Sequence, residues 1–190
     1  RNIALTYYIQ PSQAAEAQAH LTQVKRILKG LENFWGGYPA YEEGYQWFQP
    51  MGAKKAFLQN NQWSFDPLLL RDIARKWVLS GVSRPDSSLM WFADAFAYYA
   101  PVLIIEYNYD KSAAGDYMAL QGAEFDETAG VFHSLRYQVG SDEVFFEAMR
   151  SYLDKAGKVN FVTHVDRTLG SETASFLDSY LEIEATPIIE

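Results

Sequence analysis

From Pro67 onward the sequence divides into segments with helical periodicity, each bounded by its own start and stop signals. Pro67 opens the first of these segments, which stops before Gly81. The segments that follow run over about 87–100, 126–140, 142–157, 160–169 and 171–181. Apolar residues that recur at helical spacing over such a length must be buried between packed helices. We therefore predict that the C-terminal part of the chain is mostly helical.

The N-terminal third combines strand and helix patterns. The segment 3–9 (IALTYYI) is rich in β-branched and aromatic residues and ends before Pro11, which predicts a strand. Two further short strands are predicted at 43–50 and 54–60, after a helix over about 13–34. Because most strands precede most helices, we expect an α+β fold with a small N-terminal sheet.

Length, composition and charge limit the class of protein. The 190 residues favour one domain spanning 1–190, with possible subdomains at about 1–100 and 101–190. Hydrophobic residues make up 48% and aromatic residues 16%, which is enough for a substantial core. The formal net charge of −8, without a cluster of Lys and Arg, argues against a nucleic-acid partner.

The chain contains no cysteine, which excludes disulfides, thiolate metal sites and a cysteine nucleophile. Such a chain suits the periplasm or the cell exterior as well as the cytoplasm, so the sequence does not predict a compartment. No signal peptide is visible, and a chain that starts with Arg1 is expected to be a processed product or an excised domain.

The most apolar stretch, 89–105, contains Asp94 and is interrupted by Pro101. A helix is expected to end before a proline, and a charged residue is costly inside a lipid bilayer. We therefore expect a buried helix that ends before Pro101, with a further segment after it, and no membrane span.

The pattern richest in chemical information joins the helical segments 67–80 and 87–100. Arg71 and Arg75 are four residues apart, so they share one face of a helix, and Asp72 follows the first of them. Asp94 follows Arg75 after an interval of eighteen residues, counted between the two. In a zincin helix two histidines stand four apart and bind zinc, and the glutamate beside the first is the general base.

The surrounding residues resemble the gluzincin aminopeptidases, the family of aminopeptidase N. The family reads H-E-x-x-H-Q-W, then a G-x-V-T-like turn, then W-L-N-E-G-F-A-x-Y. This chain reads R-D-I-A-R-K-W at 71–77, G-V-S at 81–83 and W-F-A-D-A-F-A-Y-Y at 91–99. In the family, the glutamate of the second helix is the third zinc ligand, and here its place is held by Asp94.

The resemblance covers essentially the whole chain. Sequence motifs similar to those of the family recur, in the family's order, at 35–48, 125–140, 142–155 and 175–181. The resemblance implies a thermolysin- or zincin-like fold, with a small N-terminal sheet and helices followed by a mostly helical C-terminal half. It also implies a peptide cleft between these two parts.

The positions that carry the family's chemistry are all changed. The histidines that bind zinc correspond to Arg71 and Arg75, and the general base to Asp72. The tyrosine that stabilises the oxyanion corresponds to Phe125, which has no hydroxyl. The glutamate that holds the substrate amine corresponds to Lys55, in the segment GAKKA.

These replacements predict a degenerate site without a metal or another cofactor. Arginine keeps its proton at every biological pH and does not bind a metal cation. We therefore expect a non-catalytic aminopeptidase-like domain, a pseudopeptidase, that binds a peptide or protein segment in the former cleft or acts as a scaffold. Asp94 and Asp72 are expected to pair with the two arginines and link the two helices.

Other interpretations of the same residues remain open. The chain could be a divergent metallopeptidase or another hydrolase that uses the same cleft, or a purely structural domain of a longer protein. The charges at 71–75 could also belong to an ordinary exposed helix. A metal site built from His20, His133 and His164 is disfavoured because they fall on different elements, and His133 is expected to be structural. The oligomeric state is not predicted.

Overall fold

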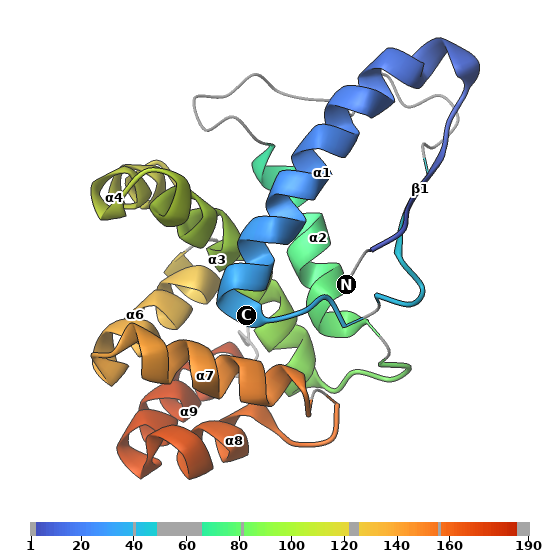
Figure 1. Cartoon of the computed structure of the whole chain (residues 1–190). Coiled ribbons are helices and arrows are strands. Elements are labelled where there is room, and N and C mark those ends of the chain that lie inside the picture. The colour runs from blue at the N-terminus through green and yellow to red at the C-terminus, as the bar shows by residue number, and fades with distance from the viewer. Residues whose placement is uncertain are drawn as a thin grey trace, which may run out of the picture.

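The computed structural model describes residues 3–39, 41–48, 66–80, 82–121, 126–155 and 157–185. This part of the chain is a bundle of helices with a short two-stranded sheet beside it (Figure 1). The helices carry almost the whole core, and the strands lie at one side of the long first helix (Figure 1).

The sheet consists of two parallel strands joined by a helix. β1 (Leu5–Tyr8) pairs with β2 (Tyr45–Phe48), with Leu5 opposite Tyr45. Between them lie a 3₁₀ turn, η1 (Pro11–Gln13), and α1 (Ala14–Trp35). A parallel pair needs such a crossover, because a tight turn can join only antiparallel strands.

Gly44 allows β2 to start close to the residue before β1. Its φ is +73°, and a Cβ there would lie 2.5 Å from the carbonyl oxygen of Ala4. The same oxygen accepts a hydrogen bond of 2.8 Å from the backbone N–H of Tyr45. Glycine is therefore needed to bring the two strands together.

The predicted α+β, thermolysin-like fold is wrong. The described residues form only two strands of four residues each, and the strands are separated by a helix instead of preceding the helices. A sheet of this size offers little surface, so the apolar helix faces pack on one another. The strand predicted at 54–60 lies outside the described residues.

The remaining elements follow β2 in the order of the chain (Figure 1). They are α2 (Pro67–Leu79), α3 (Ser87–Asn108), α4 (Lys111–Ala119), the π-helical turn η2 (Asp126–Gly130), α6 (Val131–Val139), α7 (Asp142–Leu153), α8 (Phe161–Leu169) and α9 (Ser171–Ala185). Asp, Asn or Ser side chains cap five of these helices, since each accepts a hydrogen bond from a backbone N–H of the first turn.

The helix α3 forms the centre of the core. It is apolar on nearly all sides and packs against α2, α4 and η2, among other elements. By length and composition it could cross a membrane, but 78% of its most apolar stretch is buried within the structure. The expectation of a buried helix here is confirmed, and its burial is consistent with the expectation that this helix does not span a membrane.

The predicted end of this helix before Pro101 is wrong. α3 continues through Pro101 to Asn108, and Pro101 itself is buried. A proline inside a helix removes one backbone hydrogen bond, so packing on both sides must offset the loss. The residues after the proline, Val102 to Ile105, are all buried and provide that packing.

Candidate functional site

The helices α2 and α3 place the arginines of the sequence pattern. Asp66 caps α2 by accepting a hydrogen bond of 2.9 Å from the N–H of Leu68, and Pro67 opens the first turn. The buried face of α2 includes Leu70, Ile73 and Trp77. The arginines at 71 and 75 therefore fall on a neighbouring face that is only partly covered.

Arg75 pairs with Asp94 across the two helices. Its Nε donates a hydrogen bond of 2.6 Å to Asp94 Oδ1. These are the positions that correspond to the second zinc histidine and the third zinc ligand in the resemblance. The ion pair predicted between the helices is thus present at one of the two arginines.

The burial of this pair differs from the expectation. Each side chain is 42% exposed, so water screens the interaction. A pair of this exposure contributes about 0–1 kcal/mol, compared with about 3–5 kcal/mol lost when one partner of a buried pair is removed. The pair therefore links the two helices but contributes little to stability.

Arg71 makes a different set of contacts. Its Nη2 donates to Gln121 Oε1 at 3.2 Å and, more weakly, to the hydroxyl of Tyr117 at 3.5 Å. Its guanidinium carbon lies 4.2 Å from the ring centroid of Tyr98, within the range of a cation–π interaction. Arg71 therefore links α2 to α3 and α4, and no carboxylate pairs with it among the described residues.

Asp72 does not join the arginines. Its Oδ2 lies 2.8 Å from Lys76 Nζ, one turn along the exposed face of α2. The expectation that Asp72 pairs with the arginines is therefore wrong, because Lys76 at i+4 is its nearer partner. Lys55 and Phe125, the other two positions of the degenerate site, lie outside the described residues.

The three histidines lie apart and are structural in their contacts. His20 Nδ1 lies 3.0 Å from the hydroxyl of Tyr7, and His164 Nε2 lies 2.9 Å from the carbonyl oxygen of Ala148. Burial lowers the pKa of each of the three histidines. Among the residues that the structure describes, no group of three or more His, Asp or Glu side chains is placed to hold a metal ion.

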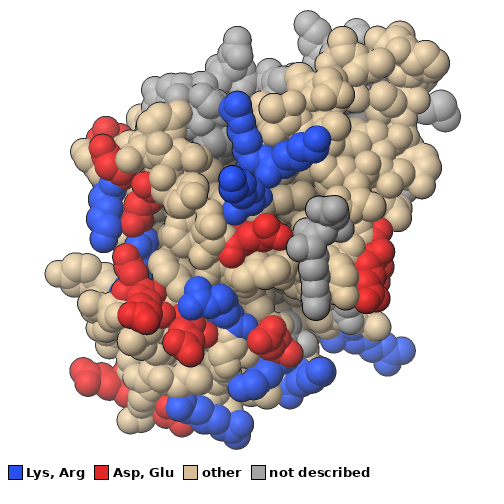
Figure 2. Space-filling view, viewed as in Figure 1, with Lys and Arg blue, Asp and Glu red and all other residues tan. Residues whose placement is uncertain are grey.

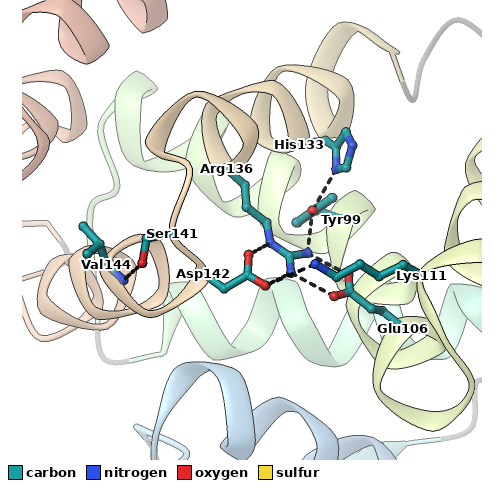
Figure 3. A network of polar contacts seen from close by, with 8 residues as sticks. All are labelled: Tyr99, Glu106, Lys111, His133, Arg136, Ser141, Asp142 and Val144. Carbon is teal, nitrogen blue, oxygen red and sulfur yellow. Dashed lines mark hydrogen bonds and ion pairs between the residues drawn. The ribbon is translucent and has the colours of Figure 1, made fainter.

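A buried polar network lies farther along α3, and the sequence did not point to it (Figure 3). Arg136 Nε and Nη2 each donate at 2.7 Å to Asp142, and Nη1 and Nη2 donate to Glu106 at 2.7 and 2.9 Å. Nη1 also donates to the hydroxyl of Tyr99 at 3.2 Å. All five N–H groups of the guanidinium are therefore used.

This network is the most buried ion cluster of the described residues. The side chain of Arg136 is 8% exposed and that of Glu106 is 17% exposed. Burial by itself lowers the pKa of Arg136, but hydrogen bonds to Glu106 and Asp142 raise it above its ordinary value. The bonds from Arg136 also lower the pKa of Asp142. The cluster joins α3, α6 and α7.

One sequence signal could have revealed this cluster. Arg136 stands four residues after the apolar Phe132, so it falls on the same, buried face of α6. An arginine on an apolar helix face requires carboxylate partners, which here come from one helix before and one helix after it. The spacing within one helix does not say which carboxylates these are.

A cavity of about 420 Å³ opens beside this network. Val102, Ala114 and Met118 contribute apolar wall, and His133, Lys111 and the ion cluster contribute polar wall. A second cavity of about 360 Å³ lies between Glu32 and Tyr41, near the end of α1. Neither cavity is lined by Arg71, Arg75 or Asp94.

Charges of both signs are mixed over much of the face shown in Figure 2. A group of basic side chains lies over α1, where Lys25, Arg26 and Lys29 are exposed (Figure 2). No ion pair joins these three to an acid of the described residues.

Comparisons with protein-family models, with curated proteins and with solved structures return no match for this chain.

Proposed function

We propose that this chain is a non-catalytic aminopeptidase-like domain that acts as a binding or scaffolding module. The observation that carries the proposal is the contact between Arg75 Nε and Asp94 Oδ1, at 2.6 Å. Two positions that correspond to zinc ligands in the resemblance are next to each other in space and hold an ion pair.

The chemistry of the two arginines supports this proposal. A guanidinium has donors only and stays protonated, so Arg71 and Arg75 repel a metal cation and offer it no lone pair. Asp94 has one oxygen committed to Arg75. Without a metal there is no activated water, which is the nucleophile of a zinc peptidase.

The proposed ligand is a peptide or protein segment that lies against α2 and α3. The side chains of Arg75 and Asp94 are half-exposed, and Asp72 and Lys76 are exposed on the same helix. These four side chains form two ion pairs with no net charge, so they favour a polar partner that contains both acidic and basic groups. The alternative of a divergent metallopeptidase or another hydrolase has no supporting ligand group in the described part of the chain.

The test restores the ligands that the resemblance implies. The triple variant Arg71→His, Arg75→His and Asp94→Glu is expected to bind about one equivalent of zinc, because three zinc-competent side chains then replace the cations. Zinc is measured by elemental analysis after dialysis, and folding is checked by circular dichroism. The matched control is Arg84→His, Arg26→His and Asp154→Glu, which makes the same changes at other exposed positions.

The zinc content of the triple variant decides between two outcomes. Stoichiometric zinc in the triple variant, but not in its control, supports the proposal that this helix pair is a degenerate metal site. A folded triple variant that binds no zinc would contradict the proposal. The resemblance would then rest on helix patterns that many unrelated proteins share.

A further inference from the structure

We infer that Arg71 anchors a carboxylate of the segment proposed to lie against α2 and α3. The inference rests on the proposed function and names the group of the partner that is recognised. Arg71 lies where α2 meets α3 and α4. Its guanidinium carbon is 4.2 Å from the ring centroid of Tyr98 on α3. Its Nη2 donates to the Tyr117 hydroxyl on α4 at 3.5 Å and to Gln121 Oε1 at 3.2 Å.

The charge of Arg71 is not balanced by a carboxylate of the described residues. Its charged neighbours on α2 and α3 form two ion pairs, Arg75 with Asp94 and Lys76 with Asp72. The three side chains that contact Arg71 are two tyrosines and a glutamine, which are uncharged at neutral pH. One positive charge is therefore left over at this junction of helices, and Arg71 carries it.

Arg71 also has N–H groups without an acceptor in the part of the chain that the structure describes. Both of its hydrogen bonds come from Nη2. Nε is buried without a partner, and Nη1 makes no hydrogen bond either but is open to solvent. In contrast, every N–H of Arg136 donates, and two carboxylates accept from it. Because a partly covered cation without a counter-ion is costly, an acidic group of a partner would offset this cost at Arg71.

The contacts of Arg71 hold its guanidinium in place for a ligand. The face of the Tyr98 ring attracts the cation, and the two bonds of Nη2 restrict rotation of the guanidinium group. A side chain that is already held in this way loses little conformational freedom on binding. The solvent-accessible Nη1 can then donate to a carboxylate oxygen in a charge-assisted hydrogen bond.

A single carboxylate beside an apolar side chain suits this surface. One unbalanced positive charge matches one negative charge, whereas a more highly charged anion would be repelled by Asp72 and Asp94. Leu68 stands three residues before Arg71, on the same face of α2, and is 65% exposed. An aliphatic side chain of the partner can cover it. The carboxylate belongs to an acidic side chain or to the C-terminus of the partner segment.

The experiment is a titration of the isotope-labelled protein with short peptides, followed by NMR of the backbone amides. Acetyl-Leu-Glu-Leu-amide carries its carboxylate in a side chain, and acetyl-Leu-Gln-Leu with a free C-terminus carries it at the end. Acetyl-Leu-Gln-Leu-amide is the neutral control. We expect a saturable shift of the Gln121 amide, beside the guanidinium, with at least one of the two acids. The amide of Val165 on α8 should stay in place and report that the fold is intact.

Three comparisons test the contact between the carboxylate and Arg71. The neutral peptide is expected to bind about tenfold more weakly than the tighter acid, since it forms no charge-assisted hydrogen bond. Arg71→Met should weaken that acid about tenfold as well, whereas Arg167→Met, at an exposed position on α8, leaves it unchanged. Arg71→Lys keeps the charge but not the planar fork, so it should weaken the acid severalfold; it is the second variant if Arg71→Met does not fold.

Two results would overturn the inference. The first is that neither acid shifts the Gln121 amide more than the neutral peptide does, up to the solubility limit. The second is an unchanged affinity for the acid in the folded Arg71 variants. The zinc test of the proposed function uses a different variant, so the two failures are distinguishable. Peptide binding at Arg71 without zinc in the triple variant removes the family assignment alone, and zinc without peptide binding removes the Arg71 anchor alone.

Discussion

At the scale of single residues, two arginines show how burial decides what an ion pair contributes. Arg75 and Asp94 are each 42% exposed, whereas Arg136 is 8% exposed and donates five hydrogen bonds to three side chains. Water screens the pair of Arg75 and Asp94. The guanidinium of Arg136 is instead largely removed from water, so that leaving a charge unpaired there is costly.

Removing the buried arginine is expected to be strongly destabilising. Arg136→Met leaves the largely buried carboxylate of Glu106 without its donor and leaves Asp142 with Lys111 alone, so it should lower the free energy of unfolding by about 3–5 kcal/mol. Urea unfolding followed by circular dichroism measures this change. Adding Glu106→Gln to Arg136→Met should recover part of the loss, because one stranded charge is then removed.

Arg75→Met is the matched control for this prediction. It removes the same charge from a half-exposed pair and should cost about 0–1 kcal/mol. A loss in Arg75→Met as large as that in Arg136→Met would contradict this account of burial. Asp94→Ala removes the other member of the same half-exposed pair. We therefore expect it to lower the free energy of unfolding by about 0–1 kcal/mol, less than the removal of a buried partner would.

Part of the site could be predicted from the sequence at this scale. The interval from Arg75 to Asp94 indicated that two charged side chains meet across two helices, and they do. The contacts of Arg71 with Tyr117 and Gln121 could not be predicted, because α4 itself was not. The segment 111–119 is short, contains Gly115 and lacks a strong apolar periodicity.

At the scale of elements, α1 and α3 approach closely at Gly30. This glycine is buried in α1, and a Cβ added there would meet the Cδ1 atom of Ile104 on α3. Glycine inside a helix costs about 1 kcal/mol relative to alanine, so close packing offsets its weak helix propensity.

The variant Gly30→Ala tests this contact. We expect it to lower the free energy of unfolding by about 1–2 kcal/mol, because the strain of overpacking exceeds the gain in helix propensity. Thermal and urea unfolding measure the change.

The double variant with Ile104→Val is the control for Gly30→Ala. Valine lacks the Cδ1 atom, so Gly30→Ala should be nearly neutral or stabilising in the Ile104→Val background. If Gly30→Ala changes the free energy of unfolding equally in both backgrounds, contact between its Cβ and Ile104 does not explain the destabilisation of the variant.

Helix positions were predictable from local signals, but one end was not. Caps and glycine stops predict most of the segments from Pro67 onward, in agreement with the observed bounds of α2 and α8. The start of α7 also agrees, but this helix ends at Leu153, four residues before the predicted end at 157. Pro101 predicts the end of a helix, yet α3 continues because the four residues after the proline, Val102 to Ile105, are buried. Tertiary packing is not visible in a local sequence pattern, so the continuation of α3 through the proline could not be predicted from it.

At the scale of the whole molecule, the predicted fold failed for a physical reason. Strand patterns near the N-terminus suggested a sheet large enough to form a layer, but the described sheet has two short parallel strands with α1 between them. One hydrophobic cluster, from Val24 to Leu177, is built almost entirely from helix faces. Local propensity predicts that a strand exists, but not how many partners it finds.

The histidines make stability depend on pH. Burial lowers the pKa of His20, His133 and His164 below the ordinary value of 6.5, so the unfolded chain binds more protons as the pH falls. The free energy of unfolding is therefore at its full value above pH 6.5 and should decrease as the pH falls below it.

Urea unfolding at several values between pH 8 and pH 5 measures this dependence. His133→Asn removes one of the titrating groups and keeps an acceptor for Tyr99, so its stability should decrease less over the same range. A wild-type stability that stays constant from pH 8 to pH 5 would contradict a lowered pKa for these three histidines in the folded protein.

The central claim, that an ion pair stands in place of a metal, is tested most directly by the zinc content of the wild-type protein. Protein purified in zinc-supplemented buffer, then dialysed without a chelator, is analysed for zinc per chain. The account predicts well under one equivalent, because Arg71 and Arg75 cannot ligate a cation. One equivalent of zinc that is lost in Asp94→Ala would contradict it.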